Sequence, residues 1–539
     1  MMASLTKGVG GLLRFCRGLL GPTPQYDPMA LELMSRLTEN NSFTRWPADR
    51  PDQWDLTEDL RWSPGVEWSD DTLDHMCGLN LCRENLEGVA DLSGLGNLER
   101  IFLSGNRLSA LILDDNFHLR ELHAVDNQLV RINLAAAPGL TELDLTGNQL
   151  TCLDLAGNHQ LVTVCVSGNH LLDLDLTRVP KLKRLVADAN QLGSLNLTGC
   201  PELNYLAVYE NRLTGLDLSR NPRLDTLNAA DNRLSRLDLS HNRELAYLNL
   251  FNTGLSALDV RHNKKLWYLV ASSNNLDELD LSGHKALTHL VVSANYLTTL
   301  DIRGNVDLRT LDVADNQIKK LDVSRNPNLW YLYASLNQME SMDTTAQAGL
   351  LIMDVTQNAI EKLNLRSNRK LQRLYAAGNR LRELDLSGNP LLERLYANHN
   401  PLRELALGDN KLQSLREMDL SDCRLPLSAL RPCVGMGSDM TVLGPQNRVF
   451  FDCLDLGPNS PGLDLTTEAQ IGGQPTTFTV LNEKKQPADP KAASVEDGLI
   501  TFKKSGRYQV MMENLRVFSN SSGRVEPVQA FTGWIDVRR

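Results

Sequence analysis

Several features that mark other protein classes are scarce or absent in this 539-residue sequence. No apolar run of about 18 residues occurs, so the sequence predicts no transmembrane helix. The GxSxG, HExxH, P-loop and dinucleotide-binding patterns are missing, and the cysteines form no CxxC pair. We therefore expect a protein that is not an enzyme and that holds no cofactor and no metal.

Cysteine and basic residues add two further exclusions. The nine cysteines are odd in number and scattered, which favours free thiols or small core residues over a disulfide framework. Two pairings stay open, Cys77 with Cys82 and Cys423 with Cys433. The net charge of −11, without any basic run, argues against a nucleic-acid partner.

An asparagine recurs every 21 residues through most of the chain. The register holds at Asn106, Asn127, Asn148, Asn169, Asn190, Asn211, Asn232, Asn274, Asn295, Asn316, Asn337, Asn358, Asn379 and Asn400, and Thr253 interrupts it. Around each position the sequence reads LxxLxLxxNxL. A fixed period of this kind predicts a solenoid, in which each coil buries its apolar side against its neighbours.

The LxL segment of each coil predicts a short strand, because alternate residues of a strand point to opposite faces. Stacked strands then form a parallel sheet with leucine inward and variable residues outward. The turn that follows leaves backbone N–H and C=O groups inside, and a buried asparagine amide can pair with both kinds. Thr253 keeps one donor and one acceptor, so we expect a tolerated local defect there.

With this motif repeated about fifteen times, the chain resembles the leucine-rich repeat family. The second half-coil, LDLSxNPxL, is most similar to bacterial repeats of the internalin type. The resemblance implies a mainly β, right-handed solenoid of about 16 coils. A coil of this length has no room for an α-helix of about 11 residues, so its back should be extended or 3₁₀-like.

The second half-coil carries two columns of its own. Asparagine recurs at Asn116, Asn158, Asn221, Asn242, Asn263, Asn305, Asn326, Asn368, Asn389 and Asn410. Aspartate recurs at Asp154, Asp175, Asp217, Asp238, Asp259, Asp280, Asp301, Asp322, Asp343 and Asp385. Like charges about 5 Å apart repel by about 0.8 kcal/mol in water. We expect turn hydrogen bonds to offset this repulsion rather than calcium, which needs about six oxygens.

The segments before the repeats differ in composition. Residues 1–26 form a leader with Lys7, Arg14 and Arg17, which favours either a disordered segment or a basic amphipathic helix. Residues 27–75 combine a short helical pattern with the tryptophans Trp46, Trp54, Trp62 and Trp68. This segment resembles the N-terminal cap of leucine-rich repeat proteins, which implies a small helical cap over the first coil.

The solenoid should extend over residues 76–432 and end in a Pro- and Gly-rich linker, residues 433–446. Residues 447–539 lose the period, and alternating apolar residues predict a small β-sandwich-like domain. Its segment FKKSGRYQVMMEN resembles C-terminal modules that follow internalin-like repeats, which implies a capping role or a second binding or anchoring role.

One short motif in the last domain is weighed as a catalytic alternative. The run Cys453-Leu-Asp455 is similar to the CxD motif of bacterial ubiquitin ligases that are fused to leucine-rich repeats. Those enzymes have a long helical catalytic domain, whereas the residues that follow Cys453 have a β-like pattern. We therefore treat ligase activity as a remote alternative.

Aromatic residues make up 5% of the chain, and most tyrosines fall on the outward positions of the predicted strands. The candidate ligand-binding residues are Tyr205, Tyr209, Tyr247, Phe251, Trp267, Tyr268, His289, Trp330, Tyr331, Tyr333, Tyr375 and Tyr396. The earlier coils carry no tyrosine there; their outward residues include Arg100, Phe102, Glu121, His123, Asp144, Thr163 and Arg184. Tyrosine gives large contact area at low entropy cost, which suits recognition, although strand propensity alone could also favour it.

We predict a monomeric protein-protein interaction module that binds a protein or peptide on a concave, tyrosine-rich sheet. The alternatives are a carbohydrate ligand, because aromatic faces also stack on sugars, and a structural scaffold without a specific ligand. The compartment stays open. The family resemblance implies export or the cell surface, whereas the lack of a signal peptide and the unpaired thiols favour the cytoplasm.

Overall fold

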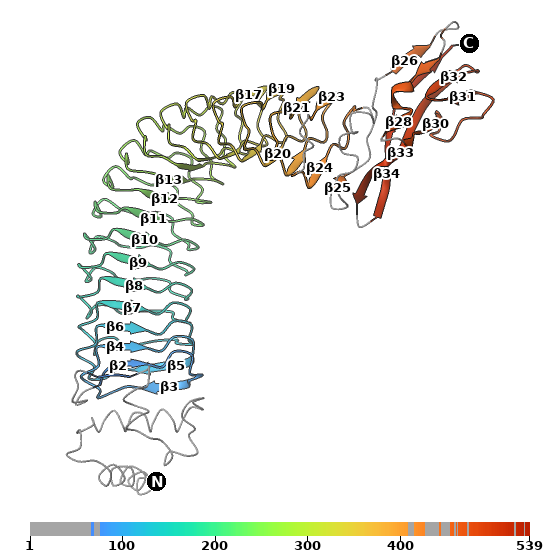
Figure 1. The fold of residues 1–539 in the computed structure, drawn as a ribbon. Coiled ribbons are helices and arrows are strands. Elements are labelled where there is room, and N and C mark those ends of the chain that lie inside the picture. Colours follow the sequence, from blue (N-terminus) through green and yellow to red (C-terminus); the bar gives the residue numbers. More distant parts are fainter. Residues whose placement is uncertain are drawn as a thin grey trace, which may run out of the picture. The chain divides into compact units, whose positions relative to one another are not determined.

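A computed structural model describes residues 66–68, 76–407, 414–425, 441–443, 453–456, 460, 462–471, 474–521, 524–532 and 534–538. The chain divides into two units, Met1–Leu266 and Trp267–Arg539. Figure 1 labels strands of both units. The leader, the helical part of the predicted cap, and Trp46, Trp54 and Trp62 lie outside the described residues. Within the described ranges, no helix has the length and apolar character needed to cross a membrane.

In the first unit, each coil contributes one short strand to a parallel sheet. The strands are β2 (Met76–Asn80), β4 (Arg100–Phe102), β6 (Glu121–His123), β7 (Glu142–Asp144), β8 (Thr163–Cys165), β9 (Arg184–Val186), β10 (Tyr205–Ala207), β11 (Thr226–Asn228) and β12 (Tyr247–Asn249). Each regular strand pairs in parallel with the same positions one period along, as in Tyr205 with Thr226. Strand β1 (Val66–Trp68) runs antiparallel to β2.

The second unit continues the same pattern. Its strands are β13 (Tyr268–Val270), β14 (His289–Val291), β15 (Thr310–Asp312), β16 (Tyr331–Tyr333), β18 (Ile352–Asp354), β20 (Arg373–Tyr375), β22 (Arg394–Tyr396), β24 (Glu417–Asp419) and β25 (Thr441–Leu443). In this sheet, the central residue of β13, β14, β15, β16, β18, β20, β22 and β24 is buried, and both its neighbours are half-exposed. The predicted leucine-inward sheet is therefore confirmed.

The backs of the coils are extended or turned, as predicted, and no α-helix occurs in the described ranges. Three parallel pairs form there: β3 (Glu87–Asp91) with β5 (Arg107–Ile112), β17 (Ser341–Asp343) with β19 (Lys362–Asn364), and β21 (Glu383–Asp385) with β23 (Glu404–Ala406). Elsewhere two successive turns shape the back. In one coil, Asn221 N–H donates to Leu218 C=O and Leu224 N–H donates to Asn221 C=O, both at 3.1 Å.

The first asparagine column is a hydrogen-bonded ladder, as the sequence predicts. Asn211 Oδ1 accepts the N–H of Leu192 in the preceding coil at 3.0 Å. Its Nδ2 donates to Ala187 O at 2.9 Å and to Val208 O at 3.1 Å. At the interruption, Thr253 Oγ1 donates to Leu250 O at 3.2 Å.

The second asparagine column makes fewer bonds. Asn221 Nδ2 donates to Leu197 O at 3.2 Å and to Cys200 O at 2.8 Å. Its Oδ1 is buried and has no hydrogen-bond partner among the described residues, and the same holds for Oδ1 of Asn116, Asn158, Asn242, Asn263, Asn305, Asn326 and Asn389. Asn368 differs, because Thr344 Oγ1 donates to its Oδ1 at 3.1 Å. The two columns therefore share a residue type but not a bonding pattern.

The aspartate column forms the predicted turn bonds. Asp175 Oδ1, for example, accepts Thr177 N–H at 2.9 Å and the Thr177 hydroxyl at 2.7 Å. An N–H two residues on donates to Oδ1 of each aspartate in this column. In the described ranges, no group of three or more His, Cys, Asp or Glu side chains is placed to hold a metal ion.

The residue before each ladder asparagine has a left-handed backbone, a feature that the sequence analysis missed. Ala189, Ala294 and Leu336 have φ of 50°, 52° and 54°. Glycine at the equivalent position avoids the resulting strain, and at Gly147 an added Cβ would lie 2.3 Å from Asp126 Oδ1. The frequent Gly and Asp residues at this position could have revealed it.

The C-terminal domain consists of small, mainly antiparallel sheets. The largest contains β26 (Cys453–Leu456), β30 (Thr477–Asn482), β33 (Gly506–Ser521), β34 (Arg524–Phe531) and β35 (Trp534–Val537). The others are β27 (Leu463–Asp464), β31 (Ala493–Glu496) and β32 (Leu499–Phe502), and the pair β28 (Gln470–Ile471) and β29 (Gln474–Pro475). The rings of Phe502 and Tyr508 join the two larger sheets at 5.1 Å. The described part contains one 3₁₀ helix, η3 (Thr466–Glu468), and no long helical segment.

No disulfide forms among the cysteines that the structure describes, so neither Cys77 nor Cys82 is disulfide-bonded, and Cys423 is a buried thiol. Cys423 occupies the ladder column in its coil, and its Sγ donates to Ala397 O at 3.3 Å. Cys433, its possible partner, lies outside the described residues. The reading of most cysteines as thiols or small core residues therefore holds for the described ones.

Candidate functional site: the aromatic strand face

We call the outward side of the parallel sheet, formed by the first and third residues of each strand, the strand face. Eight of the candidate residues occupy these positions. They are Tyr205 and Tyr247 in the first unit, and Tyr268, His289, Tyr331, Tyr333, Tyr375 and Tyr396 in the second. Tyr209 and Phe251 follow a strand by two residues, and Trp267 and Trp330 precede one directly. All twelve are half-exposed or exposed, so none belongs to the leucine core.

In the first unit, charged residues hold the tyrosines. The Arg184 guanidinium carbon lies 3.7 Å from the centroid of the Tyr205 ring, one strand away in register. Tyr209 N–H donates to Asp188 Oδ1 at 3.0 Å. Burial raises the pKa of the Asp188 carboxyl to about 6, and the Asp188 charge in turn raises the pKa of Tyr209. A cation–π contact and a buried carboxyl therefore restrain this part of the face.

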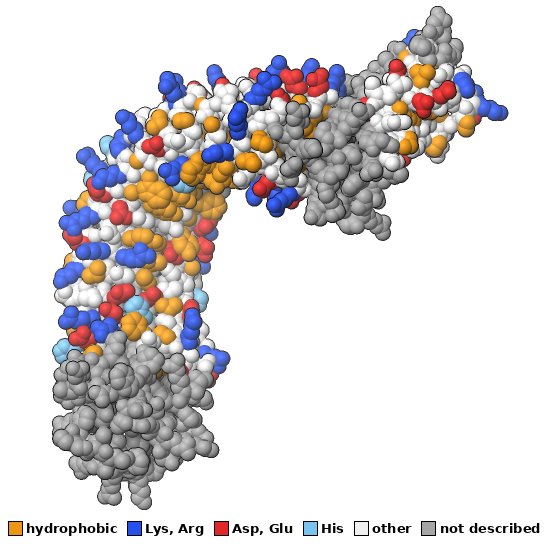
Figure 2. All heavy atoms as spheres, in the orientation of Figure 1, with side chains coloured by type: hydrophobic (Ala, Val, Ile, Leu, Met, Phe, Trp, Pro, Cys, Tyr) orange, Lys and Arg blue, Asp and Glu red, His pale blue; other side chains and the backbone are white. Residues whose placement is uncertain are grey.

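The first coils of the second unit carry a three-ring cluster. The Trp267 ring meets Tyr268 edge-on at 5.5 Å and His289 at 6.1 Å, and Tyr268 and His289 lie 5.5 Å apart. Burial and Arg309 lower the pKa of His289, which favours its neutral form. In the space-filling view, hydrophobic side chains gather on the surface around β13 (Figure 2).

Further along this unit, the rings are joined to arginines and an acid. Arg309 lies over the Trp330 ring at 5.1 Å. The Tyr375 and Tyr396 rings stack at 5.3 Å with 21° between their planes. The Tyr396 hydroxyl donates to Glu417 Oε2 at 2.8 Å, and burial and Glu417 raise the Tyr396 pKa to about 12. The Tyr396 hydroxyl therefore stays protonated at neutral pH.

Sequence reasoning placed Arg184 on the outward side but did not connect it with a ring, and it did not consider three other charged residues of the strand face, Arg373, Arg394 and Asp312. Arg184, Arg373 and Arg394 stand in the same first-residue column as Tyr205. Asp312 stands in the third-residue column, where burial raises the pKa of its carboxyl. The same 21-residue register would have identified Arg373, Arg394 and Asp312 if charged residues had been counted along with aromatic ones in the later coils.

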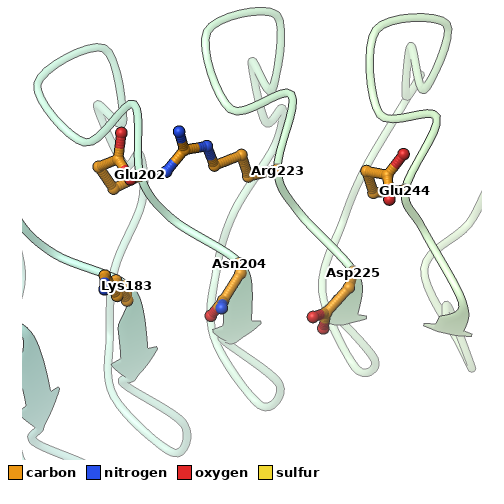
Figure 3. A pocket seen from close by; sticks show the side chains of 6 residues that line it. All are labelled: Lys183, Glu202, Asn204, Arg223, Asp225 and Glu244. Carbon is orange, nitrogen blue, oxygen red and sulfur yellow. Dashed lines mark ion pairs between the residues drawn. The ribbon is translucent and has the colours of Figure 1, made fainter.

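A shallow depression in the first unit lies beside the strands rather than on their outward positions. It is lined by Lys183, Glu202, Asn204, Arg223, Asp225 and Glu244 (Figure 3). Glu202 and Arg223 form an ion pair between coils. Lys265 pairs with Glu244 in the same way along this column. Exposed pairs of this kind contribute little to stability individually, and the arrangement is a solvated, self-compensated charged edge.

Comparisons with known proteins agree with this architecture. No family model matches the chain, and no curated protein matches it. Among solved structures, the functional domain of InlJ from Listeria monocytogenes, which includes a cysteine ladder, is 24% identical with a TM-score of 0.66, covering 78% of this chain and 91% of that one. A leucine-rich repeat protein of Leptospira interrogans is 23% identical with a TM-score of 0.55, covering 60% and 91%.

A third solved structure, YopM from Yersinia enterocolitica, is 28% identical with a TM-score of 0.54, and covers 65% of this chain and 78% of that one. In this chain the repeated ladder residue is asparagine rather than cysteine, and the period of 21 residues continues through both units. The chain is thus a leucine-rich repeat protein whose solenoid is structurally like those of bacterial internalins and YopM.

Proposed function

We propose that this chain is a non-enzymatic interaction module that binds a protein or peptide on its strand face. The observation that carries the proposal is the set of half-exposed rings on strands whose central leucines already fill the core. Neither core packing nor the asparagine ladder requires those rings. Aromatic residues gathered on an exposed face are typical of recognition surfaces.

The contacts among the rings support binding of a large partner. Stacked Tyr375 and Tyr396, the Trp267 cluster and the Arg184–Tyr205 contact restrict side-chain rotation before any partner arrives. Restraint of this kind lowers the entropy cost of association, since each rotamer-rich side chain otherwise loses about 0.5–1.5 kcal/mol on binding. We expect the chain to act as a monomer, which light scattering on the purified protein would check.

The test uses the full chain as bait with a double variant, Tyr268→Ala with Tyr331→Ala. Both residues are first in their strands, so their removal should leave circular dichroism unchanged and weaken partner binding by more than tenfold. Tyr296→Ala is the matched control, because Tyr296 is 53% exposed but does not belong to the strand face. Equal partner affinity for the wild type and the double variant would contradict the proposal.

Carbohydrate is the second candidate ligand, because Trp267 and Trp330 are 44% and 43% exposed and flat rings stack on sugars. A glycan array separates the two candidates: signal that disappears on Tyr331→Ala would favour sugar. A scaffold role predicts no ligand in either assay. For the ligase alternative, a ubiquitin-loading assay with Cys453→Ser as control should show no loading in either chain.

A further inference from the structure

Arg373, the first residue of β20, carries a side chain whose bonding is incomplete. Its Nε is buried and has no hydrogen-bond acceptor among the described residues. Its neighbours in register are Ile352 of β18 and Arg394 of β22, and neither side chain can accept a hydrogen bond. The described part of the chain also gives Arg373 no ion-pair partner.

The adjacent arginine shows the contrast. Arg394 Nη2 lies 3.3 Å from Glu417 Oε1, and the other Glu417 oxygen accepts the Tyr396 hydroxyl at 2.8 Å. The carboxylate of Glu417 is therefore already shared between Arg394 and Tyr396. Arg373 lies on the neighbouring strand, at a backbone spacing of about 4.8 Å, so its guanidinium adds a second positive charge beside Arg394. Arg373 as a whole is half-exposed, but its buried Nε–H is a donor without an acceptor, which destabilises the free protein and calls for an explanation.

The surroundings of Arg373 are apolar and aromatic. Tyr331 and Tyr333 stand two strands away on β16, Ile352 lies between, and the stacked Tyr375–Tyr396 pair flanks the other edge. All five side chains are half-exposed on the strand face. An anionic group that reached Arg373 would be partly shielded from water by these walls, which strengthens a charge-assisted hydrogen bond.

We propose that the strand face of the second unit binds a peptide segment that presents an aspartate or glutamate carboxylate to Arg373. The carboxylate completes the bonding of the guanidinium, and apolar side chains next to it in the peptide pack on Tyr331, Ile352 and Tyr375. Charge complementarity to the two arginines selects an acidic segment over a neutral one. This inference rests on the proposed peptide-binding function and adds the chemistry of the partner.

The first test needs no partner. If Arg373 awaits a ligand, Arg373→Met should leave the Tm of the full chain unchanged or raise it, because an apolar side chain removes an unpaired buried donor. Arg394→Met should lower the Tm, because it breaks the contact with Glu417. A fall in Tm for Arg373→Met as large as that for Arg394→Met would assign Arg373 a structural role and overturn the proposal.

The second test uses a random dodecapeptide library displayed on phage and selected on the full chain. We expect enriched peptides to share an Asp or Glu flanked by apolar residues. A synthetic copy of one such peptide should lose at least tenfold in affinity on Arg373→Gln, measured by isothermal titration calorimetry. Arg382→Gln is the matched control, because it removes the same charge at an exposed position in the other half of the same coil.

The outcomes distinguish the carboxylate proposal from the proposed peptide-binding function on which it rests. Peptides that need Tyr331 but lack acidic residues and ignore Arg373→Gln would preserve peptide binding and overturn the carboxylate proposal. A parallel selection on the Tyr331→Ala, Tyr375→Ala double variant is the reference. If the wild-type chain enriches no peptide beyond those that the double variant enriches, peptide binding and the carboxylate proposal are both contradicted. If the chain retains sulfated glycans and no peptide, the carboxylate proposal is also overturned.

Discussion

Two asparagines in neighbouring positions of the repeat should respond very differently to the same substitution. Asn211 belongs to the first ladder and Asn221 to the second column, and they are 9% and 0% exposed. If burial alone set the cost, Asn221→Ala would be the more damaging change. The hydrogen bonds predict the opposite order.

Asn211→Ala removes the acceptor of the Leu192 N–H, which has no other acceptor among the described residues. An orphaned buried donor costs about 1–3 kcal/mol. The carbonyls that Asn211 serves keep second donors, since Asn190 Nδ2 also reaches Ala187 O and Asn232 Nδ2 also reaches Val208 O. With a small cavity added, we expect a loss of about 2–4 kcal/mol.

Asn221→Ala removes two donor bonds, but both carbonyls keep a backbone partner: Cys200 N–H donates to Leu197 O, and Leu203 N–H donates to Cys200 O. The change also removes a buried Oδ1 that has no partner. The substitution also leaves a small cavity, as at Asn211, but it orphans no backbone donor, so we expect a cost of about 1–2 kcal/mol, below that of Asn211→Ala. Five residues replace asparagine in this column, and two of them, Ala137 and Val179, are apolar, which agrees with this expectation.

Urea unfolding followed by circular dichroism gives the difference in unfolding free energy, and native-state hydrogen exchange locates the loss at the affected coil. Exchange is needed because long repeat arrays can unfold in parts. Equal costs for the two variants, or a greater cost for Asn221→Ala, would refute the assignment of different roles to the two columns.

Three further predictions concern single positions. Thr253→Asn should raise the unfolding free energy by about 1 kcal/mol, because an asparagine amide supplies two N–H donors where the threonine hydroxyl supplies one; Thr253→Ala, which should not stabilise, is the control in the same urea titration. Leu336→Gly should raise the Tm, since Leu336 has φ of 54° and is 47% exposed, so the change relieves left-handed strain and sacrifices little burial; a lower Tm would contradict this. In the folded protein the pKa of Asp188 is about 6, above its unfolded value near 3.9. The protonated carboxyl therefore contributes fully to the free energy of unfolding below about pH 4, and this contribution is lost as the pH rises to about 6. Asp188→Asn should therefore flatten the pH dependence of stability across that window, and an unchanged slope would rule out the buried carboxyl as its source.

The repeat is where sequence reasoning succeeded. A 21-residue period places every leucine, strand and ladder asparagine by simple translation, so the ladder position of Asn211 and the parallel pairing of strands such as β10 and β11 follow from the period alone. The turn bonds of Asp175 and its column were also predictable, because they are local to two residues. The same translation placed the rings on the outward side of the sheet.

Tertiary structure decided which neighbours satisfy each group. The sequence contains similar asparagines at 211 and 221, yet only the first finds a donor for its Oδ1, because the backbone N–H groups at the second position are used in turns. It contains two adjacent arginines in one column, yet Glu417 pairs with Arg394, and Arg373 has no ion-pair partner among the residues that the structure describes. Such choices depend on side-chain rotamers and on competition for one acceptor, which a repeat period does not encode.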